Sequence, residues 1–263
     1  MELGLTDRVA VVLASTDGLG LAAARALVSE GARVAISGRD AWRLDQARLS
    51  LAECGTGEVF GECVDVTDGA ALDAHLNAVR ERWGTVDVLV TNAGGPPPGT
   101  AAEVTDEALD AAFELTLKSA LRAVRAVLPG MRAQGWGRVV ALTSSAVRQP
   151  IAGLALSNSL RAGLTGWLKT LASEVAADGV LVNSICTGMF DTARLHELIE
   201  LRAQKNGRGV DEERAALAAQ IPVGRIGRLE EFGSVVAFLA SERASFLNGV
   251  ALPLDGGASR SLL

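Results

Sequence analysis

The chain of 263 residues carries 31 acidic and 25 basic side chains, which gives a formal net charge of −6 at pH 7. Nucleic acid is not expected as a partner, because phosphate binding depends on clustered lysine and arginine. Hydrophobic residues make up 49% of the chain and only 7 residues are proline, which indicates a packed globular protein rather than a disordered one. A single domain over residues 1–263 is expected at this length.

The N-terminal segment has acids ahead of a short apolar run, so neither a secretory signal nor a membrane span is predicted. The expected location is therefore the cytoplasm. Cys54, Cys63 and Cys186 show no CxxC spacing, and His75 and His196 lie far from them in the sequence. This pattern predicts neither a metal site nor a disulfide.

Apolar runs of strand length alternate with amphipathic segments along the chain. The predicted strands cover residues 9–13, 32–36, 59–64, 86–90, 139–142, 180–185 and 250–254. Apolar residues at three and four spacing predict helices over residues 19–30, 42–52, 70–83, 106–132, 157–177 and 230–241. The alternation predicts an α/β fold in three layers, a doubly wound parallel sheet of the Rossmann type with helices on both faces.

The segment 191–222 interrupts this alternation directly after a predicted strand. It is rich in arginine, glutamate and alanine. Ligands bind outside the carboxyl ends of parallel strands, so this segment is interpreted as a helical lid over a substrate. A fixed surface insertion is the alternative interpretation.

The first predicted strand leads into a glycine-containing turn and then a helix. The turn consists of Ala14, Ser15, Thr16, Asp17, Gly18, Leu19 and Gly20. Glycines at such a turn let the backbone approach a pyrophosphate at the N-terminus of a helix. Glycines also serve close packing, so this turn alone is weak evidence for a dinucleotide.

Further motifs follow in order, and together they make a more specific pattern. They are the segment from Cys63 to Asp68, which contains Asp65 and Val66; the triplet Asn92, Ala93 and Gly94; the stretch from Val182 through Thr187, Gly188 and Thr192; and the C-terminal run that ends at Gly257. With the glycine turn, these motifs resemble the short-chain dehydrogenase/reductase family, in particular its 3-oxoacyl-ACP reductases, over nearly all residues from 5 to 257. Ala14 replaces that family's first glycine, and Thr187 replaces its proline.

The resemblance implies a nicotinamide dinucleotide bound by the glycine turn and by these later motifs. The second predicted strand ends at Arg39 and offers no carboxylate for a ribose 2′-hydroxyl. A guanidinium there suits a 2′-phosphate, so NADPH is expected rather than NADH. A solvated surface arginine is the alternative. Asp17 lies in the cofactor loop and would either repel the phosphate or pair with Arg39.

The catalytic residues of the family are mostly replaced in this chain. Active members combine asparagine, serine, tyrosine and lysine, and the matching positions here hold Thr116, Ser144, Ser157 and Arg161. No shift of the alignment restores the missing pair, because the chain contains 0 tyrosines and its only lysines are Lys118, Lys169 and Lys205. A serine hydroxyl is a far poorer acid than a phenol, and arginine stays protonated. By the resemblance, Arg161 still binds the nicotinamide ribose.

Three functions therefore remain open. The first is an NADPH-dependent reductase whose proton comes from Ser144, water, the substrate or His196, or whose substrate is an iminium ion that needs no concurrent proton. The second is a catalytically silent cofactor-binding protein that acts as a sensor or partner subunit. The third is an interaction scaffold with the same fold.

The expected ligand is a small molecule, and its identity is not encoded in any pattern of the sequence. Met189, Phe190 and His196 are the candidate substrate or lid contacts. For His196, an exposed lid-surface residue is the favoured interpretation over a proton donor. The predicted helices over 106–132 and 157–177 resemble the segments through which the family forms dimers, so a homodimer or homotetramer is expected.

Overall fold

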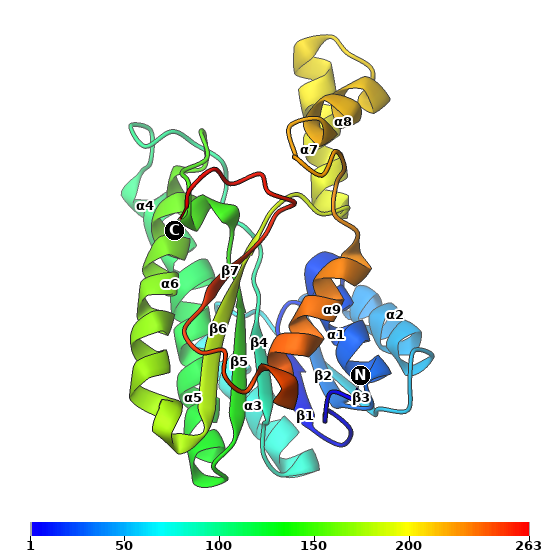
Figure 1. Cartoon of the computed structure of the whole chain (residues 1–263), viewed down its shortest axis with the longest axis vertical. Coiled ribbons are helices and arrows are strands. Elements are labelled where there is room, and N and C mark those ends of the chain that lie inside the picture. Colours follow the sequence, from blue (N-terminus) through cyan, green and yellow to red (C-terminus); the bar gives the residue numbers. More distant parts are fainter. Residues whose placement is uncertain (1, 263) are drawn as a thin grey trace.

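The computed structural model describes residues 2–262, and its centre is one parallel sheet of seven strands in the order β3-β2-β1-β4-β5-β6-β7. The predicted doubly wound α/β fold is confirmed. The strands are β1 Val9–Val12, β2 Arg33–Gly38, β3 Val59–Cys63, β4 Val88–Thr91, β5 Gly137–Leu142, β6 Val180–Thr187 and β7 Ala251–Leu254. Helices cover both faces of this sheet (Figure 1).

The sequence explains why the middle strands form as they do. Every residue of β1, β4 and β5 is buried, so these strands are nearly continuous apolar runs rather than alternating ones. β1 pairs in parallel with β2 on one side and with β4 on the other, with Ala10 opposite both Val34 and Val88. The chain therefore leaves β1 in one direction and later returns to its other side.

Several helices begin where the sequence supplies a capping side chain. They are α1 Gly18–Ser29, α2 Ala41–Ala52, α3 Gly69–Trp83, α4 Asp106–Phe113, α5 Ser119–Ala133, α6 Ala155–Val175, α7 Ala193–Asn206, α8 Val210–Ala218 and α9 Leu229–Ala240. Asp17, Asp40 and Asp68 each accept a hydrogen bond from a backbone N–H at the start of α1, α2 and α3. Such caps satisfy N–H groups that the helix itself leaves unpaired.

The core is divided into two layers by the sheet. One layer packs α1, α2 and α9 on the sheet and includes the fully buried Leu27 and Phe232. The other packs α3, α5 and α6 and includes Leu76, Val124 and Leu164. The two groups of helices lie on opposite sides of the sheet in Figure 1.

The predicted helix over 106–132 is continuous but not regular. A π-helical turn, Glu114–Lys118, separates α4 from α5. A π turn inserts an extra residue while the chain keeps its helical path, so the apolar spacing in the sequence did not reveal it. The turn contains Thr116, which is buried.

The segment 191–222 folds mainly as α7 and α8, which project from the body beyond the carboxyl ends of the strands (Figure 1). Leu195, Ile199, Leu217 and Ile221 bury a small core of their own between these helices. Within residues 2–262, no helix is both long and apolar enough to cross a membrane.

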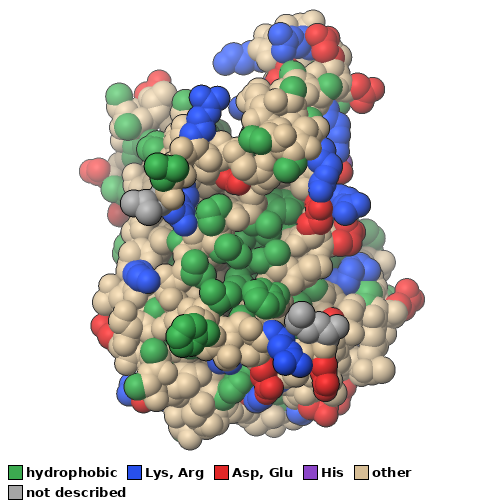
Figure 2. All heavy atoms as spheres, in the orientation of Figure 1, with side chains coloured by type: hydrophobic (Ala, Val, Ile, Leu, Met, Phe, Trp, Pro, Cys, Tyr) green, Lys and Arg blue, Asp and Glu red, His purple; other side chains and the backbone are tan. Residues whose placement is uncertain are grey.

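Hydrophobic side chains gather in the middle of the face shown in Figure 2, over the region of β7 and α9. Phe238 and Leu247 are partly exposed, and Phe246 is fully exposed. An exposed apolar patch of this kind is typical of a contact surface. Oligomerisation through the helices over 106–132 and 157–177 stays a prediction.

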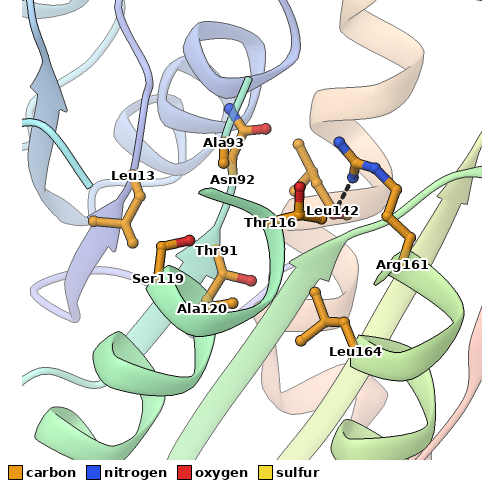
Figure 3. Close-up of a pocket in the computed structure, with 10 residues that line it drawn as sticks. All are labelled: Leu13, Thr91, Asn92, Ala93, Thr116, Ser119, Ala120, Leu142, Arg161 and Leu164. Atoms are coloured by element: carbon orange, nitrogen blue, oxygen red, sulfur yellow. Dashed lines mark hydrogen bonds between the residues drawn. The ribbon is translucent and has the colours of Figure 1, made fainter. Parts of the chain in front are cut away.

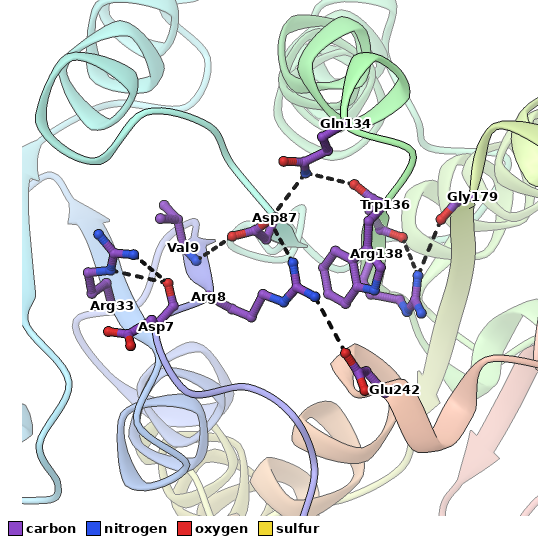
Figure 4. A network of polar contacts seen from close by, with 11 residues as sticks. Asp7, Arg8, Val9, Arg33, Asp87, Gln134, Trp136, Arg138, Gly179 and Glu242 are labelled. Carbon is purple, nitrogen blue, oxygen red and sulfur yellow. Dashed lines mark hydrogen bonds and ion pairs between the residues drawn. The ribbon is translucent and has the colours of Figure 1, made fainter.

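A polar network closes the amino edge of the sheet, opposite the carboxyl ends of the strands (Figure 4). The Asp87 carboxylate accepts hydrogen bonds from the Val9 N–H at 2.8 Å and from Gln134 Nε2 at 3.2 Å, and it pairs with Arg8 at 3.4 Å. The Arg8 guanidinium lies 3.9 Å from the centre of the Trp136 ring. Asp87 thereby joins β1, β4 and the end of α5.

Replacing Asp87 by alanine is expected to lower the free energy of unfolding by about 2 kcal/mol, because it leaves the buried Val9 N–H without an acceptor. Urea denaturation measures the effect. Asp45→Ala is the control, since it removes only an exposed pair with Arg48 and is expected to cost less than about 0.5 kcal/mol. Equal stability of the two variants would contradict a structural role for this network.

Candidate functional site

The candidate site lies at the carboxyl ends of β1 and β4, where the chain's direction across the sheet reverses. β1 is followed in sequence by its neighbour on one side, while β4 lies on its other side. The loops after such a pair of strands diverge and leave a crevice, which is where doubly wound folds bind ligands. The glycine turn follows β1 and the Asn92 loop follows β4, so the fold brings both predicted motifs to this crevice.

The glycine turn keeps its shape although its first glycine is missing. Ala14 has φ +47° and Gly18 has φ +54°, both in the left-handed region. A residue with a Cβ is strained there, by about 1–3 kcal/mol. The substitution of Ala14 for glycine therefore preserves the turn at a cost in stability.

Gly20 marks the closest approach of backbone in the site. A Cβ at this position would lie 2.5 Å from the Ala14 carbonyl oxygen and 2.8 Å from Asn92 Nδ2. Asn92 Nδ2 donates a hydrogen bond to that same carbonyl at 2.9 Å. The Asn92 side chain thus ties the end of β4 to the glycine turn, and only glycine fits between them. Gly94, by contrast, has open space around its Cα.

The two hydroxyl residues of the turn face inward. Ser15 is fully buried, and its Oγ donates to the Val12 carbonyl at 2.6 Å and accepts from the Ser37 N–H at 3.2 Å. The Ser15 N–H donates to the Ser37 carbonyl at 2.8 Å, so neither this N–H nor the Ser15 hydroxyl is free to bind a cofactor. Thr16 lies against Gly38, where a Cβ would collide with the threonine methyl group. Leu19 is partly buried and packs against the core beside α1.

The charged residues near the expected adenosine end of the cofactor do not form the Asp17–Arg39 pair that the sequence left open. The Arg39 side chain is 79% exposed and reaches Asp65 at 4.0 Å, and it does not pair with Asp17. Asp17 instead accepts a hydrogen bond from the Gly18 N–H at 2.6 Å. The Thr67 N–H and hydroxyl, together with the Arg39 charge, lower the pKa of Asp65. Val66 is buried.

A pocket beneath the crevice contains two of the four predicted catalytic positions, Thr116 and Arg161 (Figure 3). Arg161 comes from α6, and its Nη1 donates to the Leu142 carbonyl at 2.9 Å. Burial, and secondarily the charge of Arg194, lowers the pKa of Arg161 to about 10, so the guanidinium is still a cation at neutral pH. The residues that line the pocket are Leu13, Thr91, Asn92, Ala93, Thr116, Ser119, Ala120, Leu142, Arg161 and Leu164.

The pocket holds hydroxyl groups without protein partners. The Oγ1 atoms of Thr91 and Thr116 are buried, and neither has a hydrogen-bond partner among the described residues. A buried hydroxyl left unpaired costs about 1–3 kcal/mol, so such groups typically meet water or a ligand. Thr91 was not predicted as a site residue, because it lies between the predicted strand over residues 86–90 and the Asn92 motif and belongs to neither.

The two predicted catalytic serines lie outside the lining of this pocket. Ser144 follows β5, and its Oγ accepts from the Ala146 N–H at 3.1 Å, which caps a short 3₁₀ turn. Ser157 is buried in the first turn of α6, one helical turn before Arg161. The structure therefore brings Thr116 and Arg161 to one cavity and places the serines beside it.

The loop after β6 connects the site to α7. Thr187 Oγ1 donates to the Thr143 carbonyl at 2.9 Å, a contact that the family's proline at this position would lack. Gly188 has no room for a Cβ, which would lie 2.6 Å from Asp255. Thr192 caps α7, and its methyl carbon would lie 3.4 Å from a Cβ on Gly18. The base of α7 thus faces the glycine turn.

The three candidate substrate contacts serve other neighbours in this structure. Phe190 is buried and packs edge to face on Phe232, with 5.6 Å between ring centres. Met189 packs beside the small core of α7 and α8. His196 is 53% exposed at its side chain, and its Nε2 lies 2.6 Å from Asp191 Oδ1. None of these three residues lines the pocket of Thr116 and Arg161.

Arg194 is a second site residue that the sequence analysis missed. A Cβ on Gly95 would collide with the Arg194 guanidinium, so this side chain lies directly on the loop after β4. One signal was present in the sequence: Arg194 stands in the first turn of α7, where the helix dipole disfavours a cation. A charge in an unfavourable position often has a use elsewhere.

Comparison with known proteins agrees with this geometry. Residues 13–259 match the family model described as Enoyl-(Acyl carrier protein) reductase. The chain is 34% identical to a monensin polyketide synthase putative ketoacyl reductase of Streptomyces virginiae, over 96% of this chain and 97% of that protein.

Solved structures are similar over the whole fold. L-Sorbose reductase from Gluconobacter frateurii, complexed with NADPH and L-sorbose, superimposes with a TM-score of 0.95 at 34% identity and 100% coverage of both chains. An NADPH-bound short chain oxidoreductase from Pseudomonas aeruginosa PAO1, described as containing an atypical catalytic center, gives a TM-score of 0.87 at 32% identity, over 97% of this chain and 99% of that one. The chain, with its ordered motifs and its sheet, belongs to the short-chain dehydrogenase/reductase family of oxidoreductases.

Proposed function

We propose that this protein is an NADPH-dependent reductase of a small carbonyl or imine compound with a non-standard active site. The observation that carries the proposal is the shape of the glycine turn. At Gly20 the backbone has no room for a side chain, and the hydrogen bond from Asn92 to the Ala14 carbonyl holds the turn at the crevice. When bound, NADPH would supply a hydride to the substrate. The two relatives with bound NADPH support this choice of cofactor.

The residues present fit the adenosine end of NADPH. Arg39 is exposed at the end of β2 and is held only loosely by Asp65, so its guanidinium is free to meet a 2′-phosphate. The start of α1 would receive the pyrophosphate, as helix N-termini do. Asp17 opposes this fit in part, because its carboxylate already takes the Gly18 N–H and adds negative charge there.

The chain's own residues support charge stabilisation more than proton transfer. Arg161 is a cation at the pocket and would hold the nicotinamide ribose or a developing negative charge on the substrate oxygen. Neither Ser144 nor Ser157 is acidic enough to replace a phenol. A positioned general acid contributes roughly 10²–10⁴-fold, so its absence adds about 3–5 kcal/mol to the barrier of ketone reduction. An iminium substrate avoids this barrier, since its nitrogen needs no proton during hydride transfer.

The segment 191–222 is proposed to close over the substrate. Its base already contacts both sides of the crevice, through Thr192 at Gly18 and Arg194 at Gly95. Movement of α7 and α8 about Asp191 would exclude water from the reacting groups. A catalytically silent cofactor-binding protein is the second candidate, favoured by the burial of Ser157 and the threonine at position 116.

Titration with NADPH and NADH, followed by nicotinamide fluorescence, tests the cofactor proposal. NADPH is expected to bind more tightly than NADH. Gly18→Asp should abolish the binding of both, because its φ of +54° and the expected pyrophosphate leave no place for an acidic side chain. Melting temperatures show whether that variant is folded. Absence of binding by either nucleotide to the native protein would overturn the oxidoreductase proposal.

Arg39→Asp tests the preference for the 2′-phosphate. The variant is expected to lose at least about tenfold in NADPH affinity, because one charge-assisted contact becomes a repulsion, while NADH affinity changes little. Arg48→Asp makes the same charge change on the exposed face of α2 and serves as the control. Equal losses of affinity for NADPH and NADH would show that Arg39 does not bind the 2′-phosphate.

Restoring a tyrosine at position 157 tests whether the missing phenol limits the rate of ketone reduction. Ser157→Tyr is expected to raise kcat/KM for cyclopentanone by roughly 10²–10⁴-fold over Ser157→Phe, which has the same bulk without the hydroxyl. The two variants should reduce 1-pyrroline, an imine of the same ring size, at similar rates. If the native protein already reduces cyclopentanone as fast as Ser157→Tyr does, another residue supplies the proton.

A further inference from the structure

Two arginines share the crevice without an acidic partner. Arg161 uses one of its N–H groups on the Leu142 carbonyl, and the guanidinium of Arg194 lies on Gly95. Among the described residues, neither arginine forms an ion pair, whereas Arg39 and Arg214 each pair with an aspartate. No acid lines the pocket of Arg161.

The two cations act on each other. Both guanidinium groups lie at the loop after β4, because Asn92 and Ala93 line the pocket of Arg161 and Arg194 lies on Gly95. The charge of Arg194 accordingly contributes, after burial, to the lowered pKa of Arg161. Two acids lie three residues from Arg194. Asp191 is already engaged by His196 at 2.6 Å and by Arg214 at 2.9 Å, and Glu197 forms no ion pair with Arg194 among the described residues. This uncompensated positive charge stands out in a chain whose net charge is −6. An anion between the two groups would relieve the repulsion.

We infer that Arg161 and Arg194 bind the carboxylate of the substrate, which is therefore a 2-oxo acid or, more favourably, a 2-imino acid. The inference rests on the proposed reductase function and names its substrate class. Arginine presents paired N–H groups that match the two oxygens of a carboxylate. The five donors of Arg161 allow it to serve a ribose hydroxyl and a carboxylate together.

The positive charge of Arg161 and Arg194 also limits which imines can bind as substrates. A simple iminium ion would be repelled by two guanidinium groups, whereas a 2-iminium carboxylate places a negative charge between the cations and its own nitrogen. In the reduction, hydride adds to the iminium carbon and the electron pair of the C=N bond moves to nitrogen, giving a 2-amino acid and NADP⁺. For a 2-oxo acid, the pair moves to oxygen, which then takes a proton from water.

The pyrophosphate of the cofactor is the competing ligand for Arg194. Its expected seat is the N-terminus of α1 after β1, whereas Gly95 belongs to the loop after β4. Arg194 therefore lies apart from the pyrophosphate seat, next to the Asn92–Gly94 segment that is also expected to contact the cofactor. Titration of the native protein and of Arg194→Gln distinguishes a pyrophosphate contact from a contact with the substrate carboxylate.

Calorimetric titration of oxalate and of oxamide, its neutral isostere, tests the anion site at constant ionic strength, with the protein alone and with NADPH bound. Oxalate is expected to bind at least about tenfold more tightly than oxamide. Arg194→Gln and Arg161→Gln should each remove this preference, and Arg194→Lys should keep part of it. Lys205→Gln, which removes one charge from the last turn of the same helix, is the control and should leave it unchanged.

Equal affinity for oxalate and oxamide, or an unchanged preference in Arg194→Gln, would overturn the inference. So would a variant Arg194→Gln that loses NADPH affinity while its NADPH complex binds oxalate normally, because Arg194 would then belong to the cofactor. If the native protein binds no NADPH, the proposed function fails, and the titration without cofactor still decides the anion site.

Turnover tests the substrate class. With NADPH, kcat/KM for 1-pyrroline-2-carboxylate is expected to exceed that for 1-pyrroline at least about tenfold in the native protein. The ratio should approach one in Arg194→Gln. A native ratio near one, even with oxalate bound, would show that the anion site does not select the substrate.

Discussion

The contact on which the site depends is the close approach at Gly20. There the carbonyl of Ala14, the amide of Asn92 and the first turn of α1 meet with no space for a side chain. This contact fixes the loops after β1 and β4 relative to each other, and these two loops bound the crevice. It also explains why the turn tolerates Ala14 in the left-handed region: the hydrogen bond from Asn92 to the Ala14 carbonyl holds the strained conformation in place.

The electrostatics of the site depend on the two replacements at the positions of the family's lysine and tyrosine. Replacing the family's lysine by arginine keeps a cation at the pocket, but a guanidinium holds its protons at any physiological pH and cannot relay them. Replacing tyrosine by serine removes the acid itself. The buried hydroxyls of Thr91 and Thr116 lie in the pocket with Arg161 and give water a polar seat there. The pocket is thus equipped to hold charge and water, not to deliver a proton from a phenol.

Much of this arrangement could be predicted from the sequence, because it depends on local patterns. Apolar runs and amphipathic segments gave the order of strands and helices, and the glycine turn marked the crevice. The π turn over Glu114–Lys118 was not predicted, since one inserted residue leaves the apolar pattern helical on either side of it. The burial of Phe190 on Phe232 and the placement of Arg194 on Gly95 depend on contacts between residues more than forty positions apart. One sequence does not say which distant residues pack together, and the cation near the start of α7 was the one signal for the use of Arg194.

The position of Arg194 would link the proposed lid to the proposed recognition of the substrate. A cation in the first turn of α7 works against the helix dipole, so the helix would be more stable with an acid there. Thr192, two residues earlier, caps the same helix and faces Gly18. The start of α7 therefore reaches the cofactor turn with one residue and the loop after β4 with another. An anion bound by Arg194 would offset the unfavourable dipole as well as the repulsion from Arg161, so that substrate binding and stabilisation of the base of the lid become one event.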